Sequence, residues 1–350
     1  MQVDIAVIGQ GIAGSTLALE LLRRDISFVV IDKGLEHSAS KVSSGLINPI
    51  TGRNYVKSWM IDVLLPTCIS VYSSFENLLG KSYIRANPIV RSLDSIEQEN
   101  QWHLRVGDDG YTDYISEDYQ GPDYSKWFND TYAFGDVKGS FNIDVASMLS
   151  DFNTYLSERG LLVREDINYN QLAINPQSIQ ISNIQARYVI CAEGWAVKNN
   201  PYFCDLSFRP AKGEVLICQI EKIPIDHILK FHKFLVPLND DGLFWVGSNY
   251  EWRFVDNSPT EKGRSEIQSY LDTYLKVDYK IMDHLAGVRP ATKYRKPLIG
   301  RHQRFSNLFI LNGLGTKGIS LAPYWSKRLI AHILDGAPCV IDGIPNDLFA

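Results

Sequence analysis

The chain has 350 residues, of which 45% are hydrophobic and 21% are charged, so it is long enough to bury a sizeable core and to form two domains. Its net charge of −5 gives no global excess of positive charge that would attract nucleic acid or an anionic membrane surface. The five cysteines contain no CxxC pair and the seven histidines show no metal-ligand spacing, which argues against a disulfide framework and a metal site. We therefore expect a cytoplasmic globular protein without a membrane-inserted segment.

The first residues predict a parallel α/β unit. The short apolar run VDIAVIG predicts a strand buried on both faces, residues 12–24 carry apolar side chains at helical spacing, and SFVVID predicts a second buried strand. This strand, helix, strand order is typical of a right-handed βαβ unit. Residues 37–54, rich in Ser, Gly, Asn and Pro, predict a long loop, and long loops in compact domains are usually functional.

The rest of the chain alternates between helical and strand-like segments. A mostly helical stretch is expected near residues 57–79, with a kink or break at Pro66. Short strands and polar connections follow to about residue 135. Further helices are predicted at 143–159, near 260–275 and at 317–335, and further strands at 161–166, at 186–192, in three runs between 213 and 250, and at NLFILNG.

These segments predict an α/β protein built from two interleaved domains. Parts with parallel α/β character are separated by two blocks with antiparallel β character, so each domain is discontinuous in sequence. We expect a Rossmann-like cofactor domain from residues 1–80, 142–200 and 286–350, and an antiparallel-sheet α+β substrate domain from residues 81–141 and 201–285.

A glycine motif with a dinucleotide-binding pattern lies between the first predicted strand and helix. Gly9, Gly11 and Gly14 form GxGxxG, and Asp32 ends the next strand. The glycines permit a tight turn, close approach of a pyrophosphate and close helix packing, while the acid accepts hydrogen bonds from ribose hydroxyls. An Asp aimed at the 2′-hydroxyl repels a 2′-phosphate, so NADP is not expected even with Lys33 adjacent. The motif leaves NAD and FAD open, and a glycine-rich turn with a solvated Asp is the structural alternative.

The order of further motifs resembles the D-amino-acid-oxidase superfamily of FAD-dependent amine oxidoreductases, and glycine oxidase in particular. The matching stretches are SASKVSSGLINP, VICAEGWAV, PAKGEVL, GVRPATKYRKPLIGRH and GLGTKGISLAP, and together they cover nearly the whole chain. The resemblance implies FAD as the cofactor. We expect it to be non-covalent, because no cysteine or histidine lies in residues 287–300.

The resemblance also implies which residues contact FAD. They comprise the glycine turn, the acid with its neighbour, the long loop, a second backbone approach and a C-terminal helix start: Gly9, Gly11, Ile12, Ala13, Gly14, Asp32, Lys33, Ser40, Ser44, Gly45, Leu46, Ala192, Gly194, Leu314, Gly315, Thr316, Lys317, Gly318 and Ile319. An adenine contact is expected from a strand near residues 167–169. A helix start suits the flavin pyrimidine end, because its positive end stabilises the charge of the reduced ring. Lys317 adds charge there or is a solvated lysine.

Arg289, in GVRPATKYRKPLIG, is the predicted catalytic residue. In the relatives the matching arginine pairs with the substrate carboxylate, and a planar guanidinium suits a bidentate bond that fixes orientation. Holding the carboxylate places the substrate carbon against the flavin, so that hydride transfer depends on positioning. The structural alternative is an ion pair at a domain seam. The other predicted substrate-binding residues are Phe234, Tyr250 and Thr316, and core packing is the alternative role of the aromatic ones.

The sequence departs from glycine oxidase around this arginine. Phe234 and Thr316 occupy the positions of a carboxylate-binding tyrosine and a second arginine, while Tyr294 and Leu314 replace a usual aspartate and histidine. The site therefore has fewer side chains that can bind the substrate carboxylate, and free glycine is not the expected substrate.

We expect an FAD-dependent amine or amino-acid oxidase or dehydrogenase that oxidises a primary or secondary amine of an amino-acid-like small molecule. One alternative is a tRNA wobble-uridine carboxymethylaminomethyl oxidase, because GLGTKGISLAP and VGSNYEW resemble the oxidase half of the bifunctional enzyme that completes methylaminomethyl-thiouridine. Another is a flavin-binding protein without turnover. The predicted phosphate-binding edge of the tRNA alternative consists of Lys293, Arg295, Lys296, Arg301 and Arg304. The alternative interpretation is that these residues form an ordinary solvated surface.

Overall fold

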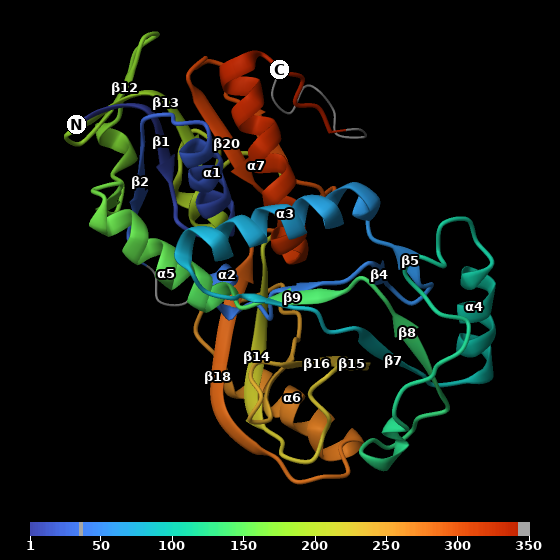
Figure 1. Cartoon of the computed structure of the whole chain (residues 1–350). Helices are drawn as coiled ribbons and strands as arrows, with labels where there is room; N and C mark the ends of the chain where they lie inside the picture. Colours follow the sequence, from blue (N-terminus) through green and yellow to red (C-terminus); the bar gives the residue numbers. More distant parts are fainter. Residues whose placement is uncertain (35–37, 342–350) are drawn as a thin grey trace.

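A computed structural model describes residues 1–34 and 38–341. Residue 37 of the predicted loop and residues 342–350 of the predicted cofactor domain lie outside these ranges. Two large β-sheets form the molecule, with long helices packed around the first sheet and between the two (Figure 1). The predicted α/β fold class is confirmed; the residue boundaries of the two domains remain a prediction.

The first sheet has eight strands and contains the predicted βαβ unit. Four strands lie side by side in the order β10 (Leu162–Arg164), β2 (Phe28–Asp32), β1 (Gln2–Ile8) and β13 (Ile184–Cys191), and all three pairs are parallel. On the far side, β13 pairs with β20 (Leu308–Asn312) in parallel, and with β12 (Ile179–Ile181) in antiparallel. The remaining strands, both antiparallel, are β11 (Ala173–Ile174) and β19 (Leu298–Arg301).

Burial on both faces explains why these strands read as continuous apolar runs. Along β1, Ile5 and Val7 belong to one core cluster, whereas Ala6 and Ile8 belong to a cluster on the opposite face. The helices beside the first of these clusters are α1 (Ile12–Arg23), α3 (Ile61–Leu79), α5 (Val145–Glu158) and α7 (Gly318–Asp335). A buried hydrogen bond of 2.7 Å between the hydroxyls of Thr16 and Ser326 joins α1 to α7.

The second sheet has seven strands and carries helix α6 (Glu261–Tyr274) on its outer face, as Figure 1 shows. Only the β15–β7 pair is parallel among its described pairings. In sheet order the strands are β18 (Lys280–Arg289), β14 (Ala211–Gln219), β17 (Leu243–Gly247), β16 (Lys233–Pro237), β15 (Ile228–Phe231), β7 (Ile89–Leu93) and β8 (Ala133–Val137). Its other face is turned toward the first sheet, since the Trp245 indole N–H donates to Val42 O at 2.9 Å.

The remaining described elements are short. They are helix α2 (Ala39–Val42), helix α4 (Ile96–Val106), the three-stranded sheet of β3 (Leu46–Ile47), β9 (Phe141–Ile143) and β6 (Ile84–Arg85), the β4 (Ile50–Thr51) and β5 (Val56–Lys57) pair, and the 3₁₀ turns η1 (Tyr124–Lys126), η2 (Tyr169–Gln171), η3 (Gly194–Asn199) and η4 (Gly315–Lys317). The predicted long loop therefore contains one turn of helix and two short strands.

Several local predictions were wrong. Helix α3 continues through Pro66, so a break there is wrong and a kink stays a prediction; buried side chains such as Leu64 and Cys68 flank the proline and hold the helix against its neighbours. Helix α4 was not predicted, since Trp102 is its only buried residue and no apolar stripe marks it. The strand expected near residues 167–169 is absent from the described chain there, where η2 begins at Tyr169.

Candidate functional site

The glycine turn at the end of β1 is so closely packed that side chains cannot be accommodated. Gly9 has φ of +101°, and a Cβ on it would lie 2.6 Å from the carbonyl oxygen of Ala192. A Cβ on Gly14 would lie 1.7 Å from the carbonyl oxygen of Gly9. Strand β1, helix α1 and the end of β13 therefore meet at backbone distance, as the dinucleotide pattern requires.

The first turn of α1 offers backbone donors to an anion. The N–H of Ile12 donates to the Ser40 hydroxyl at 3.0 Å, which brings the long loop to the helix start. The N–H groups of Ala13 and Gly14 have no acceptor among residues 1–34 and 38–341. Free N–H groups at a helix N-terminus bind phosphate favourably.

Asp32 is fixed at the end of β2. Its carboxylate accepts hydrogen bonds from the N–H of Gln10 at 2.8 Å and the N–H of Gly34 at 2.7 Å, and Arg164 lies 3.3 Å away. Because Oδ1 accepts from both Gly34 and Arg164 while Oδ2 accepts from Gln10, Oδ2 retains a lone pair for a ribose hydroxyl. Lys33, in contrast, lies 3.5 Å from Asp166 at the surface.

A buried carboxyl that the sequence did not single out lies beside this turn. Glu193 sits between the predicted residues Ala192 and Gly194, accepts a hydrogen bond from Asn200 at 2.7 Å, and is also bonded by the Tyr169 hydroxyl. Burial raises the pKa of Glu193. Its position in the sequence could have revealed it. Glu193 is the middle residue of the small-x-Gly motif, and a carboxyl at that position is buried together with the backbone on either side.

The loop segment Ser40–Leu46 is clamped between the two sheets. Ser44 is buried, Gly45 has φ of +70°, and Leu46 of β3 pairs with Asn142 of β9. The N–H of Ile143 donates to Gly45 O at 3.1 Å. The loop is therefore held beside the α1 start, where the sequence predicted cofactor contacts.

The predicted C-terminal segment begins helix α7 against the start of α1. A Cβ on Gly318 would lie 3.4 Å from the side chain of Ile12, and the Tyr72 hydroxyl fixes Ile319 through a hydrogen bond of 2.6 Å to its carbonyl oxygen. Lys317 Nζ lies 3.4 Å from the Ser58 hydroxyl. Burial lowers the pKa of Lys317, so Lys317 is not a fully solvated lysine.

Arg289 is the last residue of β18 and lies across the inner face of the second sheet. Its Nη2 donates to the Ser248 hydroxyl at 2.6 Å and its Nη1 donates to Lys212 O at 3.3 Å. A Cβ on Gly213 would lie 1.9 Å from Nη2, so that glycine makes room for the guanidinium. Burial lowers the pKa of Arg289, and no described carboxylate lies within ion-pair distance of it.

The predicted substrate-binding residues surround Arg289 unequally. The Tyr250 ring lies 4.3 Å from the guanidinium carbon and is 56% exposed, stacked against Trp252. Thr316 lies in η4, which is joined to the end of β18 because the N–H of Gly315 donates to Pro290 O at 3.2 Å. Phe234 lies on the same sheet, three strands away from β18.

Comparison with known proteins then fixes the family. The family model described as DAO, FAD dependent oxidoreductase, matches residues 4–332. The chain belongs to this family of FAD-dependent oxidoreductases. The predicted family resemblance, the FAD cofactor and the oxidoreductase class are thereby confirmed. The free N–H groups at the α1 start and the fixed Asp32 carboxylate fit the phosphates and ribose of FAD.

Individual relatives agree with the family. Glycine oxidase from Pseudomonas aeruginosa is 27% identical over 164 residues, which cover 45% of this chain and 44% of that protein; the chain thus spans less than half the length of this relative. The structure of glycine oxidase from Geobacillus kaustophilus has a TM-score of 0.78 at 16% identity, covering 98% of this chain and 97% of that one. Iminodiacetate oxidase from Chelativorans sp. BNC1 has a TM-score of 0.76 at 18% identity, covering 99% and 98%. These two structures show that the fold is shared.

No helix in the described ranges is both long and apolar enough to cross a membrane. The same ranges contain no group of three or more His, Cys, Asp or Glu side chains placed to hold a metal ion.

Proposed function

We propose that the protein oxidises a primary or secondary amine on a small, carboxylate-bearing, amino-acid-like substrate. The observation that carries this proposal is Arg289, a half-buried guanidinium without a carboxylate partner in the described chain, on the sheet face turned toward the dinucleotide turn. A buried charge is normally paired, so a substrate carboxylate is the natural partner. FAD, when bound, accepts a hydride from the carbon that bears the amine.

Protein residues position the substrate in this proposal. The Ser248 hydroxyl, Asn249 O and Lys212 O accept hydrogen bonds from Nη2 and Nη1 of the guanidinium, which leaves its Nε–H and one Nη1–H for the substrate carboxylate. The Tyr250 ring covers the guanidinium and limits its contact with water. A carboxylate fixed in this way orients the amine-bearing carbon, so the chain lowers the barrier chiefly by positioning.

FAD is proposed to lie along the α1 start, the clamped loop and the α7 start. Gly11, Ile12 and Ala13 would face its pyrophosphate, and Asp32 its ribose. The N-terminus of α7 and Lys317 would supply positive potential to the flavin ring, because no described carboxylate neutralises the lysine.

The substrate is proposed to be larger than glycine. Phe234 and Thr316 replace two carboxylate-binding positions of glycine oxidase, and one structural neighbour is named for iminodiacetate, a secondary amine. N-substituted glycines are therefore the first class to test.

Anaerobic mixing of the flavin-loaded protein with N-substituted glycines and D-amino acids tests the proposal. We expect at least one of them to bleach the flavin, and Arg289→Ala to retain FAD while losing most of that bleaching. A protein that purifies without flavin contradicts the cofactor assignment. A flavin that no amine reduces contradicts the enzymatic proposal and supports the flavin-binding alternative.

The tRNA alternative is supported by one observation. Lys293, Arg295, Arg301 and Arg304 are exposed, and none has a carboxylate within ion-pair distance in the described chain. A row of unpaired cations is the electrostatic signature of phosphate-backbone binding. Bleaching by hypomodified tRNA, with none by the small amines, would favour this second function.

A further inference from the structure

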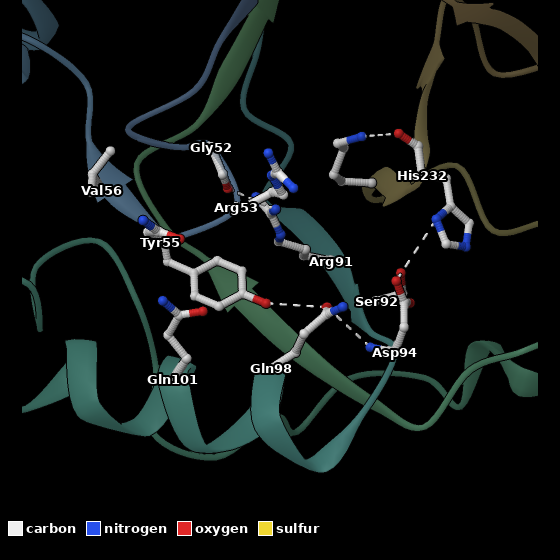
Figure 2. Close-up of a pocket in the computed structure, with 12 residues that line it drawn as sticks. Gly52, Arg53, Tyr55, Val56, Arg91, Ser92, Asp94, Gln98, Gln101 and His232 are labelled. Carbon is white, nitrogen blue, oxygen red and sulfur yellow. Dashed lines mark hydrogen bonds and ion pairs between the residues drawn. The ribbon is translucent and has the colours of Figure 1, made fainter.

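A cavity of about 800 Å³ opens on the second sheet at a distance from Arg289. The loop between β4 and β5, helix α4 and strands β7 and β15 enclose it, and cationic side chains from three separate segments reach it (Figure 2). They are Arg53, Arg91 and Lys230, with His232 at the margin.

In their hydrogen bonds and ring contacts these cations have only neutral partners, and the charge of Asp94 acts on Arg91 and Lys230 from beyond ion-pair distance. Arg91 donates to Gly52 O at 2.9 Å and lies 4.6 Å from the Tyr55 ring centre, while Lys230 donates to the carbonyl oxygen of His232. Arg53 is exposed and has no side-chain partner among residues 1–34 and 38–341. No carboxylate in that part of the chain lies within ion-pair distance of any of the three.

A single carboxylate, Asp94, lines the cavity. Its Oδ2 lies 3.8 Å from His232 Nδ1, and Figure 2 shows this contact together with the hydrogen bonds of Gln98. The cavity therefore contains three cations and one carboxylate, and that carboxylate lies next to His232.

Burial affects the ionisation of both half-buried cations, and crowding of like charge affects that of Lys230 as well. Burial lowers the pKa of Arg91. Burial, and then the charge of Arg91, lower the pKa of Lys230 to about 8. An anion between these groups would remove this repulsion and replace lost hydration, as charge-assisted hydrogen bonds do.

Strand register places the cavity on the same sheet face as Arg289. Directly paired residues share a face, and the pairs run from Val215 to Gly247, Phe234, Lys230 and Arg91 across five strands. Arg289 lies over Gly213, which has the same parity as Val215 along β14. Strands β18 and β15 are four neighbours apart, so about 19 Å separates them at roughly 4.8 Å per strand.

We propose that this cavity is a second anion-binding site that takes a phosphoryl group, carried at the far end of an extended amine substrate. The assignment to the substrate rests on the proposed function, whereas phosphoryl binding itself does not. A phosphoryl group fits better than a carboxylate because it presents three oxygens and up to two charges to three cationic donors. Phe234 lies between the two anion sites in the pairing register, so the connecting part of the substrate would cross it.

Calorimetric titration of the flavin-loaded protein with inorganic phosphate, at constant ionic strength, tests the site. We expect saturable binding that Arg91→Gln and Lys230→Gln each weaken about tenfold or more, a loss typical of a charge-assisted bond. Arg159→Gln is the matched control, because Arg159 also lies over a tyrosine ring, at 3.7 Å, but directly after the C-terminal end of helix α5. Arg53→Gln should also weaken phosphate binding. Because Arg53 is exposed and supports no packing, a loss in this variant cannot be caused by misfolding.

Absence of saturable phosphate binding, or binding unchanged in Arg53→Gln, Arg91→Gln and Lys230→Gln, would overturn the proposal. Two amines that differ only in a remote phosphate identify the source. A KM raised by the variants for the phosphorylated amine alone assigns the site to the substrate; phosphate binding with equal KM effects assigns it to free phosphate. Phosphate binding without turnover of any amine would support this site and refute the proposed function. Turnover of an amine without phosphate binding would support the proposed function and refute this site.

Discussion

Arg289→Ala is expected to remove substrate binding and leave the cofactor in place. The guanidinium contacts Ser248, Lys212 and Tyr250, and its role in the fold is confined to the end of β18. Deleting one partner of a desolvated, hydrogen-bonded charge pair costs about 2–5 kcal/mol. At 1.4 kcal/mol per factor of ten, kcat/KM for a carboxylate-bearing amine should fall by roughly one and a half to three and a half orders of magnitude.

Anaerobic stopped-flow reduction of the flavin measures this loss directly, and the absorbance of flavin released by heat measures occupancy. Arg289→Lys should lose less than Arg289→Ala, because it keeps the charge but cannot form the planar fork. Gly213→Ala should act without touching the arginine itself, since its Cβ would lie 1.9 Å from Nη2 and displace the guanidinium. Arg187→Ala is the control, because Arg187 is exposed and lies over the Tyr188 ring. Equal kcat/KM for wild type and Arg289→Ala would refute the anchoring role.

Three further changes test other parts of the site. Gly14→Ala should give protein that purifies without flavin, because the new Cβ would lie 1.7 Å from Gly9 O; full flavin occupancy would contradict the turn geometry. Lys317→Met should lower the flavin midpoint potential in a redox titration while Lys317→Arg should not, since the buried cation favours the reduced anion; equal potentials would contradict its placement. Glu193, whose pKa is raised by burial from 4.5, contributes stability that is complete below pH 4.5 and declines as pH rises through its folded pKa. Thermal melting of Glu193→Gln should therefore depend less on pH in that range, and identical profiles would contradict the burial.

Local chemistry made the cofactor half of the site predictable. Gly9, Gly14 and Asp32 lie within one βαβ unit, where backbone geometry demands particular residue types at fixed spacing. The helix expected over residues 317–335 was predictable from apolar side chains at helical spacing, and α7 spans Gly318–Asp335. Local sequence patterns predicted the secondary structure less well where an element buries little apolar surface. Helix α4 is an example, because Ser95 caps it but few of its side chains are buried.

Long-range strand pairing explains what the sequence did not reveal. Ser248 and Lys212 reach Arg289 only because β14 pairs with both β17 and β18. Arg91 and Lys230 meet because β7 pairs with β15, and the β4–β5 loop with Arg53 joins them through the hydrogen bond from Arg91 to Gly52 O. The spacing of residues along the sequence does not show that these side chains lie close together, because their proximity depends on the register of the whole sheet.

Anaerobic flavin reduction by N-substituted glycines tests the central claim most directly. The account predicts rapid bleaching of the wild-type flavin by at least one of these amines, and little bleaching of an equally flavin-loaded Arg289→Ala variant. A flavin-loaded wild-type protein that no carboxylate-bearing amine reduces, or a variant that is reduced as fast as wild type, would contradict it.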